Sequence, residues 1–248
     1  MSKVNLEAHD GIAVLRLNNG VTNAISPELV DDLLKTIKQI KNEFKGMVLA
    51  GGDKFFCIGL DLPTLLQLDR PEMTEFYVRF NQAVLDLYAL PMPTACAVDG
   101  HATAGGAIIA LSSDFRFISS GRKFIGFNEV KIGVPVPYLA DLILRQITGD
   151  RYATELMFTG EFVEPQQAQK IGLIDDVFQP EDLEEKTVAK IKELAALPPY
   201  GITVIKNNRV EAARARYEEM RSTDADWFLN CWFKPAVQEL LNEAAKKF

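Results

Sequence analysis

The stretch TACAVDGHATAGGAIIALSSDFRFIS, residues 94–119, decides the fold because it holds strand, turn, helix and strand in order. TACAV is a short apolar run of the kind that forms a buried strand. TAGGAIIALSS reads as a turn that opens a helix of small residues, and DFRFIS reads as the next strand. This alternation predicts a mainly parallel sheet with helices packed around it.

The same alternation extends toward the N-terminus. VNLEAHDGIAVLRLN, residues 4–18, alternates around HDG and predicts a β-hairpin. In residues 26–44, Ser26 is a suitable N-cap and Pro27 a suitable first residue of a helix. GMVLAGG predicts a short strand, and a second helix is expected over residues 71–90, ending before PMP.

The chain changes character after IDDVF, residues 174–178, where the strands stop. Helices are expected from residue 180 to the end, broken near LPPYG and FKPA. The aromatic side chains of residues 227–233 are too apolar for a free surface helix, so we expect this tail to pack on the core or on a partner subunit. The acidic runs PEDLEEK and RYEEMRSTDAD are expected to be solvated helix faces.

Length and composition favour one α/β domain, or a core with an appendage, among its 248 residues. The net charge of −7 argues against nucleic acid as a partner. No apolar run is long enough to span a membrane, and the N-terminus lacks a secretory signal. Three widely spaced cysteines (Cys57, Cys96 and Cys231) suggest neither a disulfide framework nor a zinc site, so we predict a cytoplasmic protein.

Two glycine turns each follow a short strand, in FFCIGLDL (residues 55–62) and in GHATAGGAII (residues 100–109). Neither turn matches a nucleotide-binding loop. Each glycine turn at a helix start leaves backbone N–H groups free. Either turn alone could simply link a strand to a helix, but two facing turns would make a two-donor pocket for a developing negative oxygen.

The other polar residues suggest little chemistry. His9 lies in the expected hairpin turn and should be exposed, while His101 beside the second glycine turn favours packing over catalysis. The chain has no G-x-S-x-G motif, which argues against a triad hydrolase. No carboxylate–histidine cluster has the spacing of a metal site, so we expect no metal.

Glu129 is the residue that needs an explanation, since it lies in the otherwise apolar run KFIGFNEVKIGVPVP, residues 123–137. A buried carboxylate is costly unless it is paired or used. It could pair with Lys131 or with an arginine elsewhere, or it could be catalytic. The residues themselves leave both readings open.

Four motifs together carry a family resemblance: GGDKFFCIGLDL, AVDGHATAGGAIIALSSDFRF, FIGFNEVKIGVPVP and PQQAQKIGLIDDVF. In order and spacing they resemble the crotonase (enoyl-CoA hydratase/isomerase) superfamily over most of residues 4–180. The resemblance implies an α/β spiral of ββα turns with a C-terminal helical region, which we place at residues 1–195 and 196–248. It also implies a homotrimer or a dimer of trimers.

The resemblance assigns roles to both turns and to the glutamate. The backbone N–H groups of Leu60 and Gly105 would form an oxyanion hole for a thioester enolate, and Glu129 would be the general base and acid. Hydratases of the family have a second glutamate three residues after the oxyanion-hole glycine, where this chain has Ile108. An isoleucine cannot activate water, so the pattern most resembles the Δ3,Δ2-enoyl-CoA isomerase branch.

The remaining site assignments also follow from the resemblance. The substrate is expected to be an acyl-CoA, and no separate cofactor is needed because coenzyme A is part of that substrate. Residues expected near it are Ile58, Gly59, Asp61 and Gly106, with Ile108, Phe127 and Pro135 as apolar walls of the acyl pocket. Lys246 and Lys247 are candidates for phosphate contact, although a solvated tail is the simpler reading.

Three alternatives stay open. A hydratase would need a second acid from elsewhere, for example Asp61 or Glu161. A thioester hydrolase or a decarboxylase could use the same oxyanion hole. A non-catalytic acyl-CoA-binding protein on an enzyme fold is a third reading, because fold does not determine function.

Overall fold

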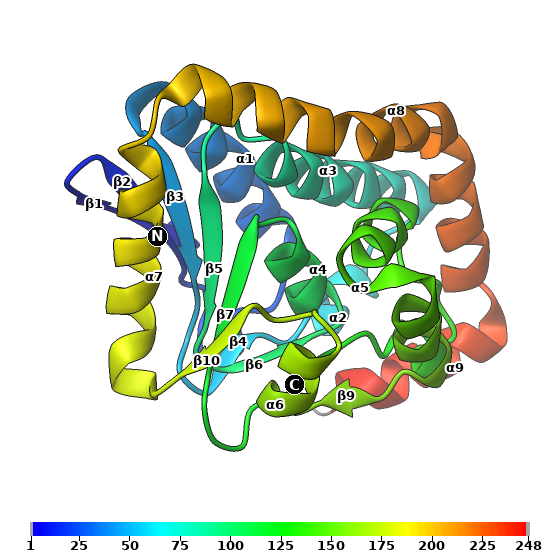
Figure 1. The fold of residues 1–248 in the computed structure, drawn as a ribbon. Coiled ribbons are helices and arrows are strands. Elements are labelled where there is room, and N and C mark those ends of the chain that lie inside the picture. Colours follow the sequence, from blue (N-terminus) through cyan, green and yellow to red (C-terminus); the bar gives the residue numbers. More distant parts are fainter. Residues whose placement is uncertain (1, 247–248) are drawn as a thin grey trace.

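The computed structural model describes residues 2–246 and contains an α/β core followed by C-terminal helices (Figure 1). The strands are β1 (Val4–His9), β2 (Ile12–Leu17), β3 (Gly46–Ala50), β4 (Phe55–Cys57), β5 (Thr94–Val98), β6 (His101–Thr103), β7 (Phe115–Ser119), β8 (Ile125–Gly126), β9 (Phe162–Val163) and β10 (Asp176–Phe178). The helices are α1 (Pro27–Glu43), α2 (Leu62–Leu65), α3 (Arg70–Tyr88), α4 (Gly105–Leu111), the 3-10 helix η1 (Glu129–Ile132), α5 (Tyr138–Thr159), α6 (Pro165–Lys170), α7 (Pro180–Ala195), α8 (Pro199–Trp232) and α9 (Pro235–Ala245).

A six-stranded sheet forms the centre, in the order β1-β2-β3-β5-β7-β10. Its first two strands form the expected antiparallel hairpin, and every other pair of neighbouring strands in this sheet is parallel. Asp10 and Gly11 both have positive φ, which is the backbone that a two-residue hairpin turn requires. The hairpin prediction is confirmed, and so are the strands expected at GMVLA, TACAV and FRFIS.

Both faces of this sheet are buried, and alternate residues along its strands lie in two different hydrophobic cores. Leu15 and Leu49 lie in the main core with α1, α3 and α4, whereas Val14 and Val48 lie in a smaller core on the other face. Helix α7 covers that second face with Leu183 and Ile191, and Figure 1 shows it alone on its side of the sheet. Parallel strands are stable because helices exclude water from both faces.

A second sheet, in the order β4-β6-β8-β9, is a finding that the single expected sheet did not include. Its strands have two or three residues each. Such short strands carry no readable alternation, so their sequence pattern could not mark them. Strands β4, β6 and β8 are parallel, which brings their carboxyl ends to one edge of the sheet.

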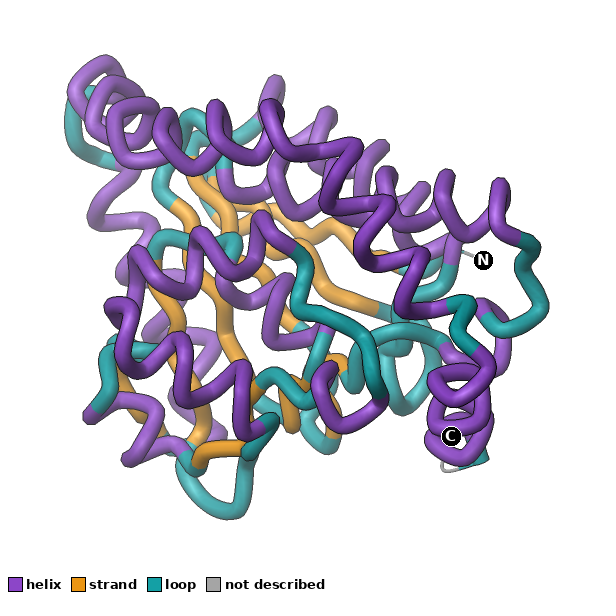
Figure 2. Tube along the Cα trace, turned by 90° about the vertical axis from the view of Figure 1, so that its right-hand side faces the viewer, coloured by secondary structure: helices purple, strands orange, loops and turns teal. Residues whose placement is uncertain are grey.

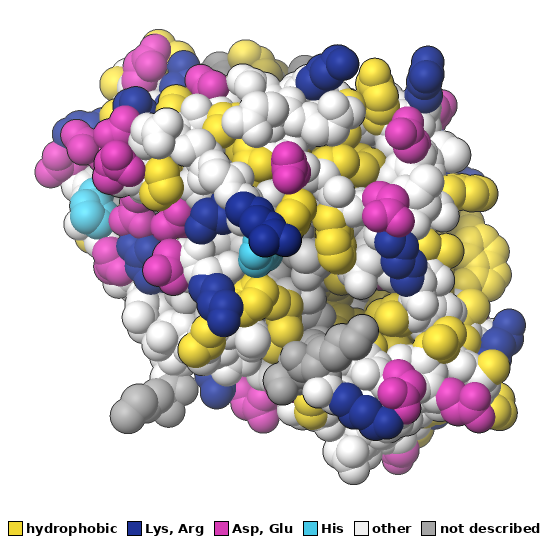
Figure 3. Space-filling model, turned by 90° about the horizontal axis from the view of Figure 1, so that it is seen from below, with side chains coloured by type: hydrophobic (Ala, Val, Ile, Leu, Met, Phe, Trp, Pro, Cys, Tyr) yellow, Lys and Arg dark blue, Asp and Glu magenta, His cyan; other side chains and the backbone are white. Residues whose placement is uncertain are grey.

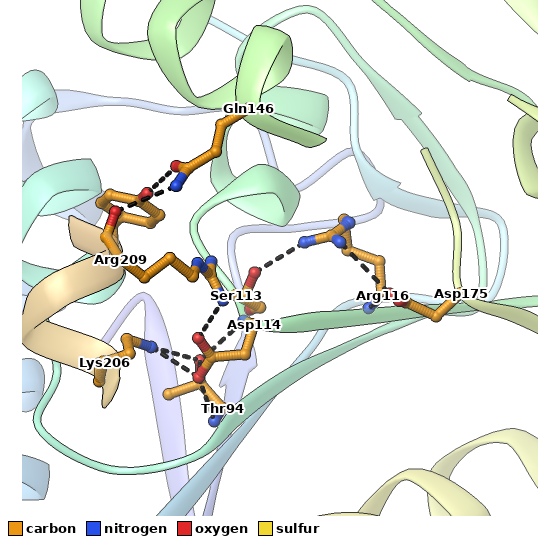
Figure 4. Close-up of polar contacts among 9 residues, drawn as sticks. Thr94, Ser113, Asp114, Arg116, Gln146, Asp175, Lys206 and Arg209 are labelled. Atoms are coloured by element: carbon orange, nitrogen blue, oxygen red, sulfur yellow. Dashed lines mark hydrogen bonds and ion pairs between the residues drawn. The ribbon is translucent and has the colours of Figure 1, made fainter. Parts of the chain in front are cut away.

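Helix α8 crosses the top of Figure 1 and packs against α3 and α5 (Figures 1 and 2). A buried charge cluster holds it to the core (Figure 4). Asp114 accepts hydrogen bonds from Lys206 Nζ at 2.6 Å, from Arg209 Nη1 at 2.5 Å and from the Thr94 hydroxyl at 2.9 Å. Burial lowers the pKa of Lys206, and the nearby Asp114 carboxylate opposes that shift.

The helical tail packs on the core in part as expected. Phe228 and Trp232 are buried, whereas Trp227 is 53% exposed. The reading of residues 216–226 as a solvated face is wrong at Tyr217 and Asp224, which are buried. Both residues lie on the face of α8 that meets the core. Their neighbours in the sequence are mostly charged, so the sequence pattern did not reveal this buried face.

Two further observations concern the whole described chain. Within residues 2–246, no helix is both long and apolar enough to cross a membrane. All three cysteines are free thiols.

Candidate active site

The candidate site lies at the carboxyl ends of β4, β6 and β8, where three loops converge. The strands lead into the first glycine turn, the second glycine turn and the Glu129 segment, respectively. A small cavity of about 90 Å³ opens between them. The residues that line it are Ile58, Leu60, Leu62, Tyr77, Phe80, Ala104, Ile108, Asn128, Glu129, Ile132, Val134, Pro137, Phe228 and Ala244.

The two glycine turns lie directly against each other. Gly59 has φ +100°, and a Cβ there would stand 3.0 Å from the Ala104 Cβ and 3.2 Å from the Gly105 nitrogen. The Thr103 hydroxyl donates to the Ile58 carbonyl at 3.0 Å and ties one turn to the other. Only glycine provides both this backbone conformation and this close approach.

The amides of Leu60 and Gly105 have no hydrogen-bond acceptor within residues 2–246, and the next two amides of the first turn of α4 have none either. The adjacent Asp61 N–H donates to the Ile25 carbonyl, and the Ala104 N–H donates to the Gly126 carbonyl. Ala104 has φ +50° and ψ −124°, a costly backbone conformation for a residue with a side chain. The structure therefore leaves free donors on both adjoining turns.

Glu129 begins the short helix η1, and only 5% of its surface is exposed. Its Oε2 atom is buried and has no hydrogen-bond partner among the described residues. Burial raises the pKa of the Glu129 carboxyl to about 7, and a hydrogen bond to its own backbone opposes this shift. The reading of Glu129 as the partner of Lys131 is wrong, since Lys131 Nζ lies 2.7 Å from Glu161 Oε1.

The other residues predicted for the site fall into two groups. Ile58, Leu60 and Ile108 line the cavity together with Glu129.

Six predicted residues do not line the cavity: Gly59 and Gly105 of the two turns, and the four residues described next. Gly106 packs against β4, where a Cβ would lie 2.1 Å from the Cys57 carbonyl oxygen. Asp61 accepts a hydrogen bond from the Thr64 N–H and caps α2. Phe127 is fully buried in the main core, and Pro135 lines a neighbouring hollow, so the expected acyl walls are corrected at both positions. Phe127 follows β8 directly and packs into the core, and it is the next residue, Asn128, that lines the cavity.

No second carboxylate lines the cavity beside Glu129 within the described chain. The two acids considered for that role are used elsewhere: Asp61 caps α2, and Glu161 is an exposed partner of Lys131. Ile108 lines the cavity instead.

Several lining residues were missed because they come from distant segments. Tyr77 and Phe80 lie on α3, Phe228 on α8 and Ala244 on α9. Hydrophobic periodicity marks such residues only as apolar helix positions, and nothing in it reveals which cavity they reach. On the face seen from below, hydrophobic side chains line a hollow with charged side chains around it (Figure 3).

The terminal lysines and the two histidines were also considered in the sequence analysis. The exposed Lys246 pairs with Glu243, and Lys247 lies outside the described residues. The His101 ring stacks on Phe124 and its Nδ1 accepts the Phe124 N–H at 3.1 Å, which confirms a packing role. His9 is exposed, as expected.

Comparison with known proteins gives a consistent result. A family model described as enoyl-CoA hydratase/isomerase matches residues 7–244. The mitochondrial enoyl-CoA delta isomerase 1 of Homo sapiens is 25% identical over 242 residues, covering 96% of this chain and 80% of that protein. A putative enoyl-CoA hydratase of Thermus thermophilus is 32% identical over 202 residues, 79% of each protein.

The fold matches equally well. The crystal structure of human mitochondrial delta3-delta2-enoyl-CoA isomerase superposes with a TM-score of 0.95 at 24% identity. The superposition covers 99% of this chain and 97% of that one. The expected fold class, an α/β crotonase-like core with C-terminal helices, is therefore confirmed.

Proposed function

Because this chain belongs to the enoyl-CoA hydratase/isomerase family, we propose that it is a Δ3,Δ2-enoyl-CoA isomerase. Such an enzyme moves the C3 double bond of an acyl-CoA to C2 by transfer of a proton. The observation that carries this proposal is a single buried carboxylate, Glu129, whose Oε2 atom has no hydrogen-bond partner among the described residues, in the same cavity as Ile108.

Glu129 has the properties of a base for this reaction. Desolvation raises its pKa to about 7, which makes its carboxylate a stronger base while leaving a large ionised fraction near neutral pH. The carboxylate would take a proton from C2 of the substrate and return it at C4. One group can serve both steps because the proton stays on the same face of a planar dienolate.

The free amides of Leu60 and Gly105 would stabilise the intermediate. When the C2 proton leaves, negative charge develops on the thioester oxygen, and two preorganised N–H donors stabilise that charge. The strained Ala104 and the packed Gly59 hold the two turns in position before the substrate arrives. These donors therefore need little reorganisation during the reaction.

Ile108 distinguishes isomerisation from hydration. A hydratase must orient and deprotonate a water molecule, and a second polar group is required for that task. Here the cavity wall at this position is apolar, which keeps water from a reactive intermediate. The second candidate function is nevertheless hydration, which is favoured by the name of the Thermus thermophilus relative at 32% identity.

A spectroscopic assay separates these functions. Purified protein is mixed with 3-hexenoyl-CoA, and ultraviolet absorbance of the conjugated 2-enoyl thioester is followed, with 2-hexenoyl-CoA run in parallel. We expect conjugation to appear with the first compound and no loss of absorbance with the second.

The other outcomes have distinct meanings. Loss of the 2-enoyl signal without isomerisation would establish the hydratase. Binding of acyl-CoA esters without turnover of either compound would favour a non-catalytic binding protein or another thioester reaction, and would contradict the proposed isomerase.

We also propose a cytoplasmic location and a homotrimer or dimer of trimers. The free cysteines fit a reducing compartment. The word mitochondrial in the name of the human relative describes the location of that relative. The exposed aromatic rings of Phe158 and Trp227, 77% and 53% exposed, support an assembly that covers them.

A further inference from the structure

We propose that Tyr77 and Phe228 form a stop at the end of the cavity that restricts the acyl chain to a short one. The inference rests on the acyl-CoA part of the proposed function and names its substrate class. It concerns two residues on helices α3 and α8, far from the glycine turns in the sequence.

The stop is a pair of packed rings. The Tyr77 and Phe228 rings both line the cavity, and their centroids lie 4.2 Å apart at an interplanar angle of 22°. Behind them the Trp232 ring lies 5.8 Å from that of Phe228. All three side chains are at most 2% exposed, so the sides of the two rings that face away from the cavity are packed against protein.

Asp224 holds the tyrosine in place. The buried Tyr77 hydroxyl donates to Asp224 Oδ2 at 2.9 Å, while Asp224 Oδ1 accepts the Tyr138 N–H at the start of α5 at 3.0 Å. A rotation of Tyr77 away from the cavity would leave both its hydroxyl and a carboxylate oxygen unpaired in the interior. Such an unpaired buried group is costly, so the ring stays where it closes the cavity.

The cavity volume limits the length of the acyl chain. An apolar cavity of about 150 Å³ holds one benzene molecule of six carbons. The cavity of about 90 Å³ therefore holds roughly four carbons. An acyl chain that reaches from the oxyanion-hole amides to the two rings is consequently short, and a longer one meets them.

The wall beside the stop is thin. Val134 lines this cavity and also a neighbouring hollow of about 330 Å³, which Asp224 lines from α8. Space exists beyond the wall, so it is the side chains between the two hollows that end the first one. Neither ring of the stop lines the second hollow, so trimming a ring should lengthen the accepted chain by enlarging the first cavity itself.

Isothermal titration calorimetry with saturated acyl-CoA esters from acetyl to dodecanoyl tests the stop without any turnover. For the wild type we expect affinity to rise about fourfold per methylene up to about six carbons, which are the carbonyl carbon and C2 at the glycine turns plus the roughly four carbons that the cavity holds, and then to stop rising or fall. Phe228→Leu and Phe228→Ala should move this limit to chains about two carbons longer. The matched control is Phe117→Leu, a buried ring in the smaller core on the other face of the sheet, which does not line the cavity and should leave the limit unchanged.

The results that would overturn the proposal are equally specific. Wild-type affinity that rises through dodecanoyl-CoA would show that the rings are no stop, as would an unchanged limit in the folded Phe228→Leu protein. An equal shift in Phe117→Leu would assign the effect to general loosening. A sharp length limit without isomerisation would overturn only the isomerase, whereas no binding of any acyl-CoA would overturn both proposals.

Discussion

Replacing Glu129 by glutamine should change activity and pH-dependent stability at once, because the same desolvation causes both effects. The wild-type carboxyl has a pKa near 4.5 in an unfolded chain and about 7 when folded. Below pH 4.5 it is protonated in both states. Between 4.5 and 7 the unfolded chain loses the proton while the folded protein keeps it, so the folded protein loses stability as the pH rises.

The size of this effect follows from the shift. A change of one pKa unit corresponds to 1.36 kcal/mol, so raising the pKa from 4.5 to about 7 costs about 3 kcal/mol above pH 7. Glu129→Gln removes the titration but keeps the shape. The free energy of unfolding of the variant, minus that of the wild type, should therefore be about 3 kcal/mol larger at pH 8 than at pH 4.5.

Urea denaturation at the two pH values measures this difference, and the assay with 3-hexenoyl-CoA measures activity. We expect kcat to fall roughly 10²–10⁴-fold in the variant, since the general base is lost. In the wild type, kcat/KM should rise with pH through about 7, as the free enzyme's base ionises.

The control is Glu161→Gln, because that carboxylate is 72% exposed and lies outside the cavity. It should leave the activity and the difference between the two pH values nearly unchanged. A stability difference of Glu129→Gln that does not vary with pH, or a wild-type kcat/KM limb near 4.5, would refute the buried, unpaired state of this base. Undiminished kcat in Glu129→Gln would refute its catalytic role.

Three further predictions address the oxyanion hole, the α8 anchor and the assembly. Gly59→Ala should lower kcat/KM by roughly 10²–10³, because the new Cβ separates the two glycine turns. The control is Gly121→Ala, at a glycine with a similar φ and open space around it, which should leave kcat/KM unchanged. Equal losses in the two variants would contradict this prediction. Asp114→Asn should destabilise the fold by about 3–5 kcal/mol in urea denaturation, because the buried Lys206 loses its carboxylate partner. The surface-pair variant Asp182→Asn should cost less than about 1 kcal/mol. Similar values for the two variants would contradict the role of Asp114 in holding α8 to the core. Light scattering after size exclusion should give three or six times the chain mass, and a monomer at micromolar concentration would be the contrary result.

Local chemistry in the sequence determined most of the elements. The hairpin follows from Asp10 and Gly11, and α1 begins where Ser26 accepts the Leu29 N–H and Pro27 follows it. These features depend on backbone preferences and on contacts a few residues apart, which the order of residues specifies directly. The glycine turns could be found for the same reason, since Gly59 requires a positive φ that few other residues adopt.

The partner and the pKa of Glu129 could not be determined from local sequence. Its apolar neighbours indicated a buried carboxylate, yet the sequence left an ion pair with Lys131 open, and only the packing of the chain shows that Lys131 pairs with Glu161. Its raised pKa has the same origin, because desolvation depends on every segment that closes around the group.

The cavity itself was decided by the tertiary structure. Tyr77 and Phe228 are 151 positions apart, on helices whose apolar faces look alike in sequence. Asp224 sits in a charged run that suggested solvent, although its carboxylate is buried between Tyr77 and the start of α5. Residue type and local periodicity determine that a helix has a buried face. Which distant side chains meet on that face, and how much space they leave, depends on the packing of the whole chain.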